Sequence, residues 1–325
     1  MPQITNETWD TTWTLVDRVK GKKIHDNYFN KPSVLNYFTN IAGEEKFTGG
    51  KEIEIGLEFG ATSGTWFNGH DDLPTTEPDI VQAAFVPWAY FATPVVIAFD
   101  NEMESRQASF AEALLEKKQS NAMKSIKNDM DIALQSARTG KACLGIQDTV
   151  RNTVTSGTLG GIDLSTNTWY RNQSYTTSTD FDAYSAPYFT GYTALNTLWN
   201  NCSDGEDMPD MHLTTLTFYA QYENIMNSTG NLRYNDTKSG SKWGIYTGAP
   251  AFHGAPVIFS RNAPSGQWYM FNKSALKVAT QTGVSFMKTP FQSPHNQLSK
   301  ICYVVHSIQM LPYNPRRTGV ATTLT

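Results

Sequence analysis

The sequence predicts an α+β fold, and three patterns along the chain carry this prediction. Residues 52–59 alternate between apolar and acidic or glycine positions, as a strand with one buried face does. Residues 102–138 carry apolar side chains at steps of three and four, which is typical of a long helix with one buried face. Beyond residue 156 the chain alternates short segments of both kinds. A chain of 325 residues is long enough to bury a substantial core.

The first forty or so residues have no steady period. Aromatic side chains recur there among polar ones, which favours an arm that lies across other surfaces; a peripheral helix packed on its own domain is the alternative. The aromatic residues are Trp9, Trp13, Tyr28, Phe29, Tyr37 and Phe38.

A projecting hairpin is predicted next, because the alternating strand is followed by a loop of turn residues and then by the uncharged run 83–99. Pro87 and Pro94 would break a helix in that run, so we predict a buried strand pair rather than a membrane span. An isolated hairpin is marginal in water. Its apolar face therefore needs the rest of the fold or a neighbouring subunit. The candidate intersubunit contacts on the projection are Ile53, Ile55, Leu57, Phe59, Trp66 and Phe67.

The long helix is predicted to begin after Asp100 or Asn101, since Asn101 and Glu104 have capping-box spacing, and to stop at Gly140. It lacks sustained heptads, so it should lie against a sheet rather than in a coiled coil. The second half of the chain is predicted to hold helices near 194–199 and 216–226 and strands at 211–214, 255–260, 267–271 and 301–311.

Charge and cysteine content limit the possible functions. The formal net charge is −4, no long Lys/Arg run appears, and the densest basic spots are at residues 20–23 and 316–317, so any contact with DNA should be weak and non-specific. The three widely spaced cysteines, Cys143, Cys202 and Cys302, do not describe a disulfide framework.

Motifs for chemistry are missing from the sequence. The six histidines show no HxH or HExxH spacing, and there is no CxxC pair, phosphate loop or GxSxG elbow. The best acidic clusters, Asp71–Asp72 and residues 204–210, read more simply as solvated turns than as cation sites. We therefore predict no catalytic residue, no metal and no cofactor, and a chain that is not an enzyme.

Four segments, in order, resemble the major capsid proteins of tailed phages, which have the Hong Kong 97-type fold. The most specific is TLGGIDLSTNTWYRNQ at 158–173, a Gly-Gly-Ile-Asp turn that leads to an aromatic-Arg-Asn ending. The others are PDMHLTTLTFYAQYENIM at 209–226, FHGAPVIFSRNAP at 252–264 and WYMFNKSALKV at 268–278. The likeness covers roughly residues 50–311, and the segment that follows is less similar.

The resemblance implies a place for each region in a capsid subunit. The implied domains are an N-terminal arm at 1–43, an extended loop over the adjacent subunit at 44–82, a peripheral domain with a spine helix at 83–155, an axial domain at 156–300, and a C-terminal strand and tail at 301–325.

The function implied is a shell subunit that forms hexamers and pentamers of an icosahedral capsid around phage double-stranded DNA. The expected partners are other copies of the chain, the packaged DNA, and scaffolding, portal and decoration proteins; no membrane is expected. Assembly would occur in the bacterial host cytoplasm, and the product would be the virion capsid. Two alternatives stay open: an encapsulin-like bacterial compartment, which shares this fold, and a β-rich hydrolase or carbohydrate-binding protein, which the Trp, Tyr and Asn content suggests.

Overall fold

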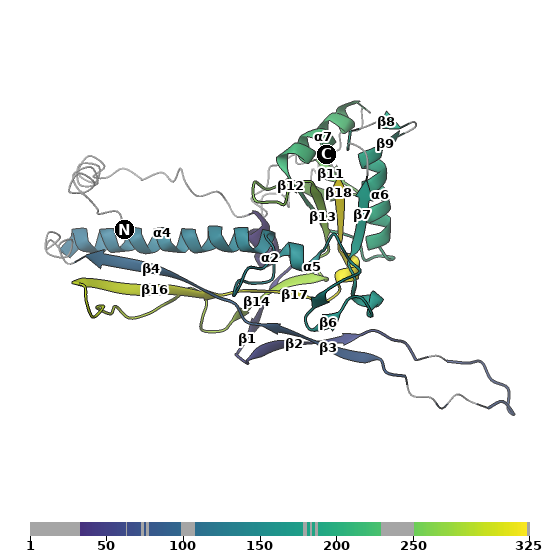
Figure 1. The fold of residues 1–325 in the computed structure, drawn as a ribbon, viewed down its shortest axis with the longest axis horizontal. Helices are drawn as coiled ribbons and strands as arrows, with labels where there is room; N and C mark the ends of the chain where they lie inside the picture. The colour runs from purple at the N-terminus through teal and green to yellow at the C-terminus, as the bar shows by residue number, and fades with distance from the viewer. Residues whose placement is uncertain are drawn as a thin grey trace. The chain divides into compact units, whose positions relative to one another are not determined.

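The computed structural model of the protein describes residues 33–62, 64–72, 75, 78–98, 108–177, 181–182, 184–185, 188–228 and 250–323 (Figure 1). Residues 31–325 form one compact unit. Within the described ranges its strands form a six-stranded sheet, two three-stranded sheets and three two-stranded ones. The predicted α+β class is therefore confirmed.

The elements up to residue 149 are α2 (Ser33–Asn40), β1 (Glu44–Phe47), β2 (Glu52–Glu58), β3 (Val81–Pro87), β4 (Tyr90–Ala98), α4 (Ala108–Gln135) and α5 (Ile146–Thr149). Those from 158 to 228 are β5 (Thr158–Leu159), β6 (Ile162–Asp163), η1 (Thr168–Tyr170), β7 (Gln173–Thr177), β8 (Tyr184–Ser185), β9 (Tyr188–Phe189), α6 (Thr190–Cys202), β10 (Met211–Thr214) and α7 (Leu216–Ser228). The remaining ones are β11 (Ala251–Phe252), β12 (Ala255–Phe259), β13 (Gln267–Phe271), β14 (Leu276–Gln281), β15 (Met287–Lys288), β16 (Ser299–Ser307), β17 (Gln309–Pro312), η3 (Pro315–Arg317) and β18 (Gly319–Thr323).

The six-stranded sheet has the order β11-β12-β10-β13-β18-β7, with α6 packed on β7 and β18 and α7 packed on β12. Trp268, Leu198 and Tyr222 lie in the core cluster that the helices close over one face of this sheet. The last strand, β18, runs between β13 and β7, antiparallel to the first and parallel to the second. The end of the chain, predicted only as a completing strand and tail, thus supplies an inner strand of the largest sheet.

A second layer is built on the long helix. Helix α4 packs against β4 and β16, which form a nine-residue antiparallel ladder with β15 on its far edge (Figure 1). Ile126, Met130 and Leu134 are buried on the helix face predicted to be apolar. The helix is described from Ala108 and ends at Gln135, so the predicted start at 102 and its capping residues lie outside the described part of the chain.

Several predicted boundaries move. Residues 1–32 of the predicted arm lie outside the described residues, but 33–40 form α2, whose Val34, Tyr37 and Phe38 are buried in the main core. Strand β1, assigned to the extended loop, instead pairs with β14 in the sheet β1-β14-β17. Strands β14 and β15, which lie within the predicted axial range, pair with β17 and β16. Strand pairing, rather than position in the sequence, places β1, β14 and β15 in these sheets.

A buried carboxylate joins α2 to α4. Asp131 Oδ1 accepts the backbone N–H groups of Leu35 at 2.9 Å and Val34 at 3.2 Å, in the first turn of α2. Its other oxygen accepts the side-chain amide of Gln135 at 2.7 Å. Burial raises the pKa of the Asp131 carboxyl, although these donors oppose the shift. The first turn of a helix has N–H groups without intrahelical acceptors, so Asp131 acts as a remote cap.

We expect Asp131→Ala to lower the free energy of unfolding by about 2–4 kcal/mol, because it leaves two buried N–H groups without an acceptor. Asp131→Asn keeps one acceptor oxygen and should cost roughly half as much. Urea denaturation of both variants measures the difference. Equal stability of Asp131→Ala and wild type would show that α2 does not depend on this cap.

Candidate intersubunit surfaces

The base of the hairpin is held by the chain's own core. Strands β2 and β3 pair antiparallel from Glu52 opposite Pro87 to Glu58 opposite Val81. On β2 the alternation predicted from sequence is present, and Ile53, Ile55 and Leu57 are 3%, 3% and 6% exposed. Their cluster includes side chains from β5, β6, η1, β14 and β17: Leu159, Ile162, Tyr170, Ala279 and Leu311. The prediction that these three residues contact a neighbouring subunit is therefore wrong; they contact the same subunit.

The Gly-Gly-Ile-Asp turn explains why the hairpin leaves the body where it does. Gly160 and Gly161, between β5 and β6, have φ values of +59° and +82°. Gly160 lies so close to β3 that a Cβ there would stand 2.9 Å from the Ala84 Cβ. Its carbonyl oxygen accepts the N–H of Phe85 at 2.9 Å. The turn thus supplies a backbone contact on the outer edge of β3, which only a residue without a side chain permits.

The far part of the projection is different. Phe59 is partly exposed and stacks on Trp169 of η1 at 5.0 Å between ring centroids. Trp66 is fully exposed, and Phe67 is 66% exposed. As intersubunit contacts, Phe59, Trp66 and Phe67 remain a prediction. Val81 and Phe85 on β3 are also exposed, and sequence reasoning missed them because it assigned the start of that strand to the loop and the rest to a buried pair.

A second exposed surface, the apolar sheet face, lies on the side of β4, β16 and β15 opposite α4. Directly paired residues share a face of a sheet, and the pairs Ala92–Val305, Pro94–Tyr303 and Val96–Ile301 lie side by side there. The face consists of Tyr90, Ala92, Pro94 and Val96 on β4, Ile301, Tyr303 and Val305 on β16, and Met287 on β15. None of the eight is charged, and Tyr90, Val96, Tyr303 and Met287 are exposed. Exposed apolar side chains gathered in this way make the face a candidate interaction surface.

The prediction that 83–99 forms two strands is correct, but the prediction that they pair with each other is wrong. The run forms β3 and β4, which pair with β2 and β16 and not with each other. Only one face of β4 is covered by α4 in this subunit. Residues 90–98 carry apolar side chains at both odd and even positions. Strands covered on both faces have such continuous apolar runs, so this pattern was the signal in the sequence for a second contact surface on β4.

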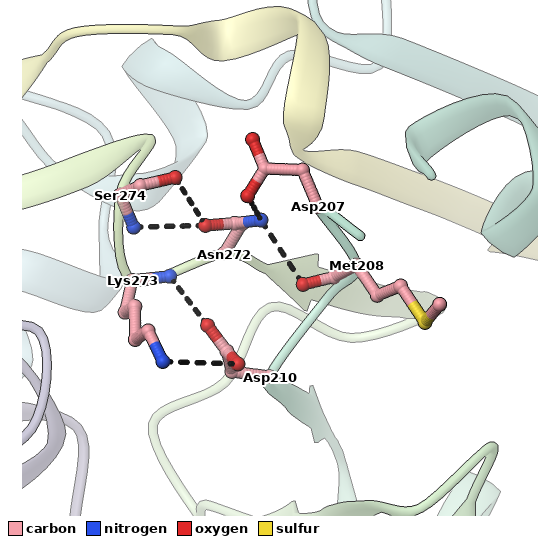
Figure 2. Close-up of polar contacts among 6 residues, drawn as sticks. All are labelled: Asp207, Met208, Asp210, Asn272, Lys273 and Ser274. Atoms are coloured by element: carbon pink, nitrogen blue, oxygen red, sulfur yellow. Dashed lines mark hydrogen bonds and ion pairs between the residues drawn. The ribbon is translucent and has the colours of Figure 1, made fainter. Parts of the chain in front are cut away.

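The acidic cluster at 204–210 works as a structural tie (Figure 2). The Asn272 side-chain amide donates to Asp207 Oδ1 at 3.2 Å and to the Met208 carbonyl oxygen at 3.0 Å, while its oxygen accepts the Ser274 N–H at 2.8 Å. Asp210 accepts the backbone N–H of Lys273 at 2.9 Å. These contacts fasten the segment before β10 to the turn between β13 and β14.

Ionisable groups elsewhere show the same structural use. Asp204 pairs with Arg317, whose guanidinium lowers the pKa of that carboxyl. Burial lowers the pKa of His212 to about 3, so this imidazole stays neutral between Phe252 and Trp268. Burial also raises the pKa of Cys143 to about 11, which leaves the thiol protonated and unreactive at neutral pH.

Two further classes of site can be stated for the described residues alone. They contain no group of three His, Cys, Asp or Glu side chains placed to hold a metal ion. Nor does this part of the chain include a helix with the length and apolar character needed to cross a bilayer.

No family model and no curated protein matches the sequence, but solved structures do match the fold. The capsid of a native GTA particle matches with a TM-score of 0.64 at 9% identity, over 94% of each chain. The capsid of cyanophage A-1(L) matches at 0.66 and 12% identity, over 93% of this chain and 95% of that one. The holo-SrpI encapsulin of Synechococcus elongatus PCC 7942 matches at 0.58 and 9% identity, over 95% and 94%. The predicted Hong Kong 97-type fold is confirmed.

Replacement of each glycine of the turn tests the hairpin anchor. We expect Gly160→Ala to lower the free energy of unfolding by roughly 2–4 kcal/mol, because it adds a steric contact with Ala84 to the left-handed backbone cost of about 1–2 kcal/mol. Gly161→Ala is the matched control, since a Cβ there meets nothing within 4 Å and only the backbone cost applies. Thermal or urea unfolding of both variants should separate them. Equal losses would mean that the close approach to β3 carries no energy.

A second prediction follows from the burial of Leu57 in the subunit's own core. Leu57→Asp places an unpaired carboxylate in the core cluster, so we expect a loss of about 3–5 kcal/mol in folding stability, comparable with Met130→Asp in the α4 core. Phe67→Asp, on the exposed part of the same hairpin, should change it by less than about 0.5 kcal/mol. Circular dichroism during urea titration gives all three values. A Leu57→Asp variant as stable as Phe67→Asp would contradict the internal packing of β2.

Proposed function

We propose that this chain, which has the fold of tailed-phage capsid proteins, is a major capsid protein. In this proposal it assembles with copies of itself into the hexamers and pentamers of an icosahedral shell around double-stranded DNA. The observation that carries the proposal is that the fold is shared along nearly the whole of both chains with phage capsid subunits.

The exposed surfaces support self-association. The apolar sheet face and the residues Trp66 and Phe67 would remain in water in an isolated subunit. Obligate interfaces typically bury about 2,000–5,000 Å² and remove such side chains from water. The hairpin and the sheet face are different surfaces, so a contact between the hairpin of one copy and the sheet face of another is heterologous. Heterologous contacts close into rings when the rotation between copies permits. Rings of five and six copies are the units from which an icosahedral shell is built.

The charge of the chain suits a container for DNA. A subunit with a net charge of −4 gains little from phosphate neutralisation, so its contacts with packaged DNA should be non-specific and weak. We infer that the shell forms in the cytoplasm of a bacterial host and ends as the virion capsid. Scaffolding, portal and decoration proteins are the expected additional partners.

An encapsulin-like compartment is the second candidate, and the match to an encapsulin favours it as an alternative. Both candidates predict closed shells from one chain, so the contents distinguish them. Shells filled with nuclease-protected DNA support the capsid; shells that contain a co-purifying enzyme and no DNA support the compartment.

We expect the expressed protein to form capsomer rings or shells, because contact between copies removes its exposed apolar side chains from water. Electron microscopy and light scattering across concentration and salt provide the measurement. A particle that stays at the monomer mass of 36.2 kDa under all conditions would contradict self-assembly.

A further inference from the structure

A pocket of about 300 Å³ opens at the base of the hairpin. We call it the socket; it lies where the end of β2 meets η1 and the segment around η3. Its lining includes one acidic side chain, two basic ones and several aromatic ones: Glu58, Phe59, Trp169, Tyr170, Tyr313, Asn314, Arg316 and Arg317. A volume of this size is at the lower limit of ligand sites, which suits one large side chain better than an extended ligand.

The walls of the socket are preformed. Trp169 stacks on Phe59 and donates its indole N–H to Asn167 Oδ1 at 3.3 Å. The Tyr313 hydroxyl donates to the Glu45 carboxylate, and Arg317 is paired with Asp204. Aromatic faces and guanidinium groups around one cavity favour an aromatic guest, through stacking and cation–π contacts.

The far part of the hairpin carries a guest of this kind. Trp66 is fully exposed, and the exposed residues Asp71 and Asp72 follow a few positions later. From residue 52 to residue 98 the chain has seven acidic residues and no Lys or Arg. The hairpin therefore presents an indole beside carboxylates. The indole suits the aromatic walls of the socket, and the carboxylates can pair with the exposed Arg316, which lines the socket on the η3 segment while the acidic Glu58 lines it at the end of β2.

We propose that Trp66 of one copy inserts into the socket of a second copy, and that the nearby carboxylates of the first pair with Arg316 of the second. The guest must come from another copy, because the two arms of the hairpin stay joined beyond β2 by the bond from Phe59 N–H to the Ile80 carbonyl oxygen at 2.9 Å, and the projection runs away from its own base (Figure 1). This inference rests on the proposed shell and specifies one of its contacts. Each hairpin then serves as donor at its far end and as acceptor at its base.

Removal of the indole is the first test. Trp66→Ala should leave the circular dichroism spectrum unchanged, since the side chain is fully exposed in the subunit. It should raise the concentration needed for half-assembly by about thirtyfold, as loss of a central aromatic anchor does. Thr65→Ala is the matched control at the adjacent exposed position and should assemble like wild type. Assembly of Trp66→Ala at the wild-type concentration would overturn the proposal.

Disulfide trapping locates the contact. Cys143, Cys202 and Cys302 are all buried, so a variant with Thr65→Cys and Asn314→Cys exposes only two thiols in the described residues. Oxidised assemblies of this variant should give a ladder of linked chains on non-reducing electrophoresis, and each single variant should give none beyond dimers. Assemblies without a ladder would overturn the proposal.

A second cysteine pair separates the alternative contact. Leu298 is exposed just before β16, beside the apolar sheet face. A ladder from Thr65→Cys with Leu298→Cys, and none from the pair with Asn314→Cys, would place the far end of the hairpin on the sheet face and overturn the socket. Failure of the wild type to assemble at all is a different result, because it would contradict the proposed shell rather than the choice of contact.

Discussion

The close contact between the Gly160–Gly161 turn and strand β3 is the constraint on which the rest of the projection depends. A two-stranded hairpin has too little buried surface to be stable alone. Here one face of β2 is buried against segments more than one hundred residues later in the chain, and the outer edge of β3 donates the Phe85 N–H to the Gly160 carbonyl oxygen. A base held in this way lets the far end of the hairpin extend without support of its own.

The same anchoring separates two kinds of apolar residue within one hairpin. Ile53, Ile55 and Leu57 stabilise the subunit, whereas Trp66 and Phe67 contribute nothing to its core. Some buried polar groups also stabilise the subunit itself. Asp131 and Asn272 are used to fasten elements of the subunit to one another. The candidate surfaces for contact with other copies are therefore the exposed apolar ones, and the exposed acidic residues Asp71 and Asp72 lie on the hairpin beside one of them.

Local patterns in the sequence predicted local structure well. The alternation at 52–58, the stripe of α4 and the segments of β10, α7 and β13 all form the elements expected, because each pattern reports burial of one face. The resemblance of four segments predicted the fold that those elements build. The sequence pattern does not identify the partner that buries a face. Alternation shows that Ile55 is covered but not whether Leu159 of the same chain or a neighbour covers it, since both would produce the same pattern.

Two other features needed three-dimensional information for related reasons. Strand β18 has a short, mixed sequence, and its inner place in the sheet comes from pairing with β13 and β7 rather than from its own composition. The apolar sheet face depends on the register between β4 and β16. Exposed residues alternate with less exposed ones on each strand, and only their pairing brings the exposed residues of both strands onto one face. The socket joins three segments that are distant in sequence, and no spacing motif could have revealed it.

The inner position of β18 also orders events during synthesis. The six-stranded sheet cannot close until residues 319–323 have left the ribosome, because β13 and β7 are joined only through that strand. Residues 52–87 emerge much earlier, and their buried face finds β5 and β6 only after a further seventy or so residues have been translated. During that interval the nascent chain exposes the apolar face of β2, because the segments that cover it have not yet been translated. Completion of the six-stranded sheet is therefore a late step in folding, later than pairing of β2 with β3 and later than burial of the β2 face by β5 and β6.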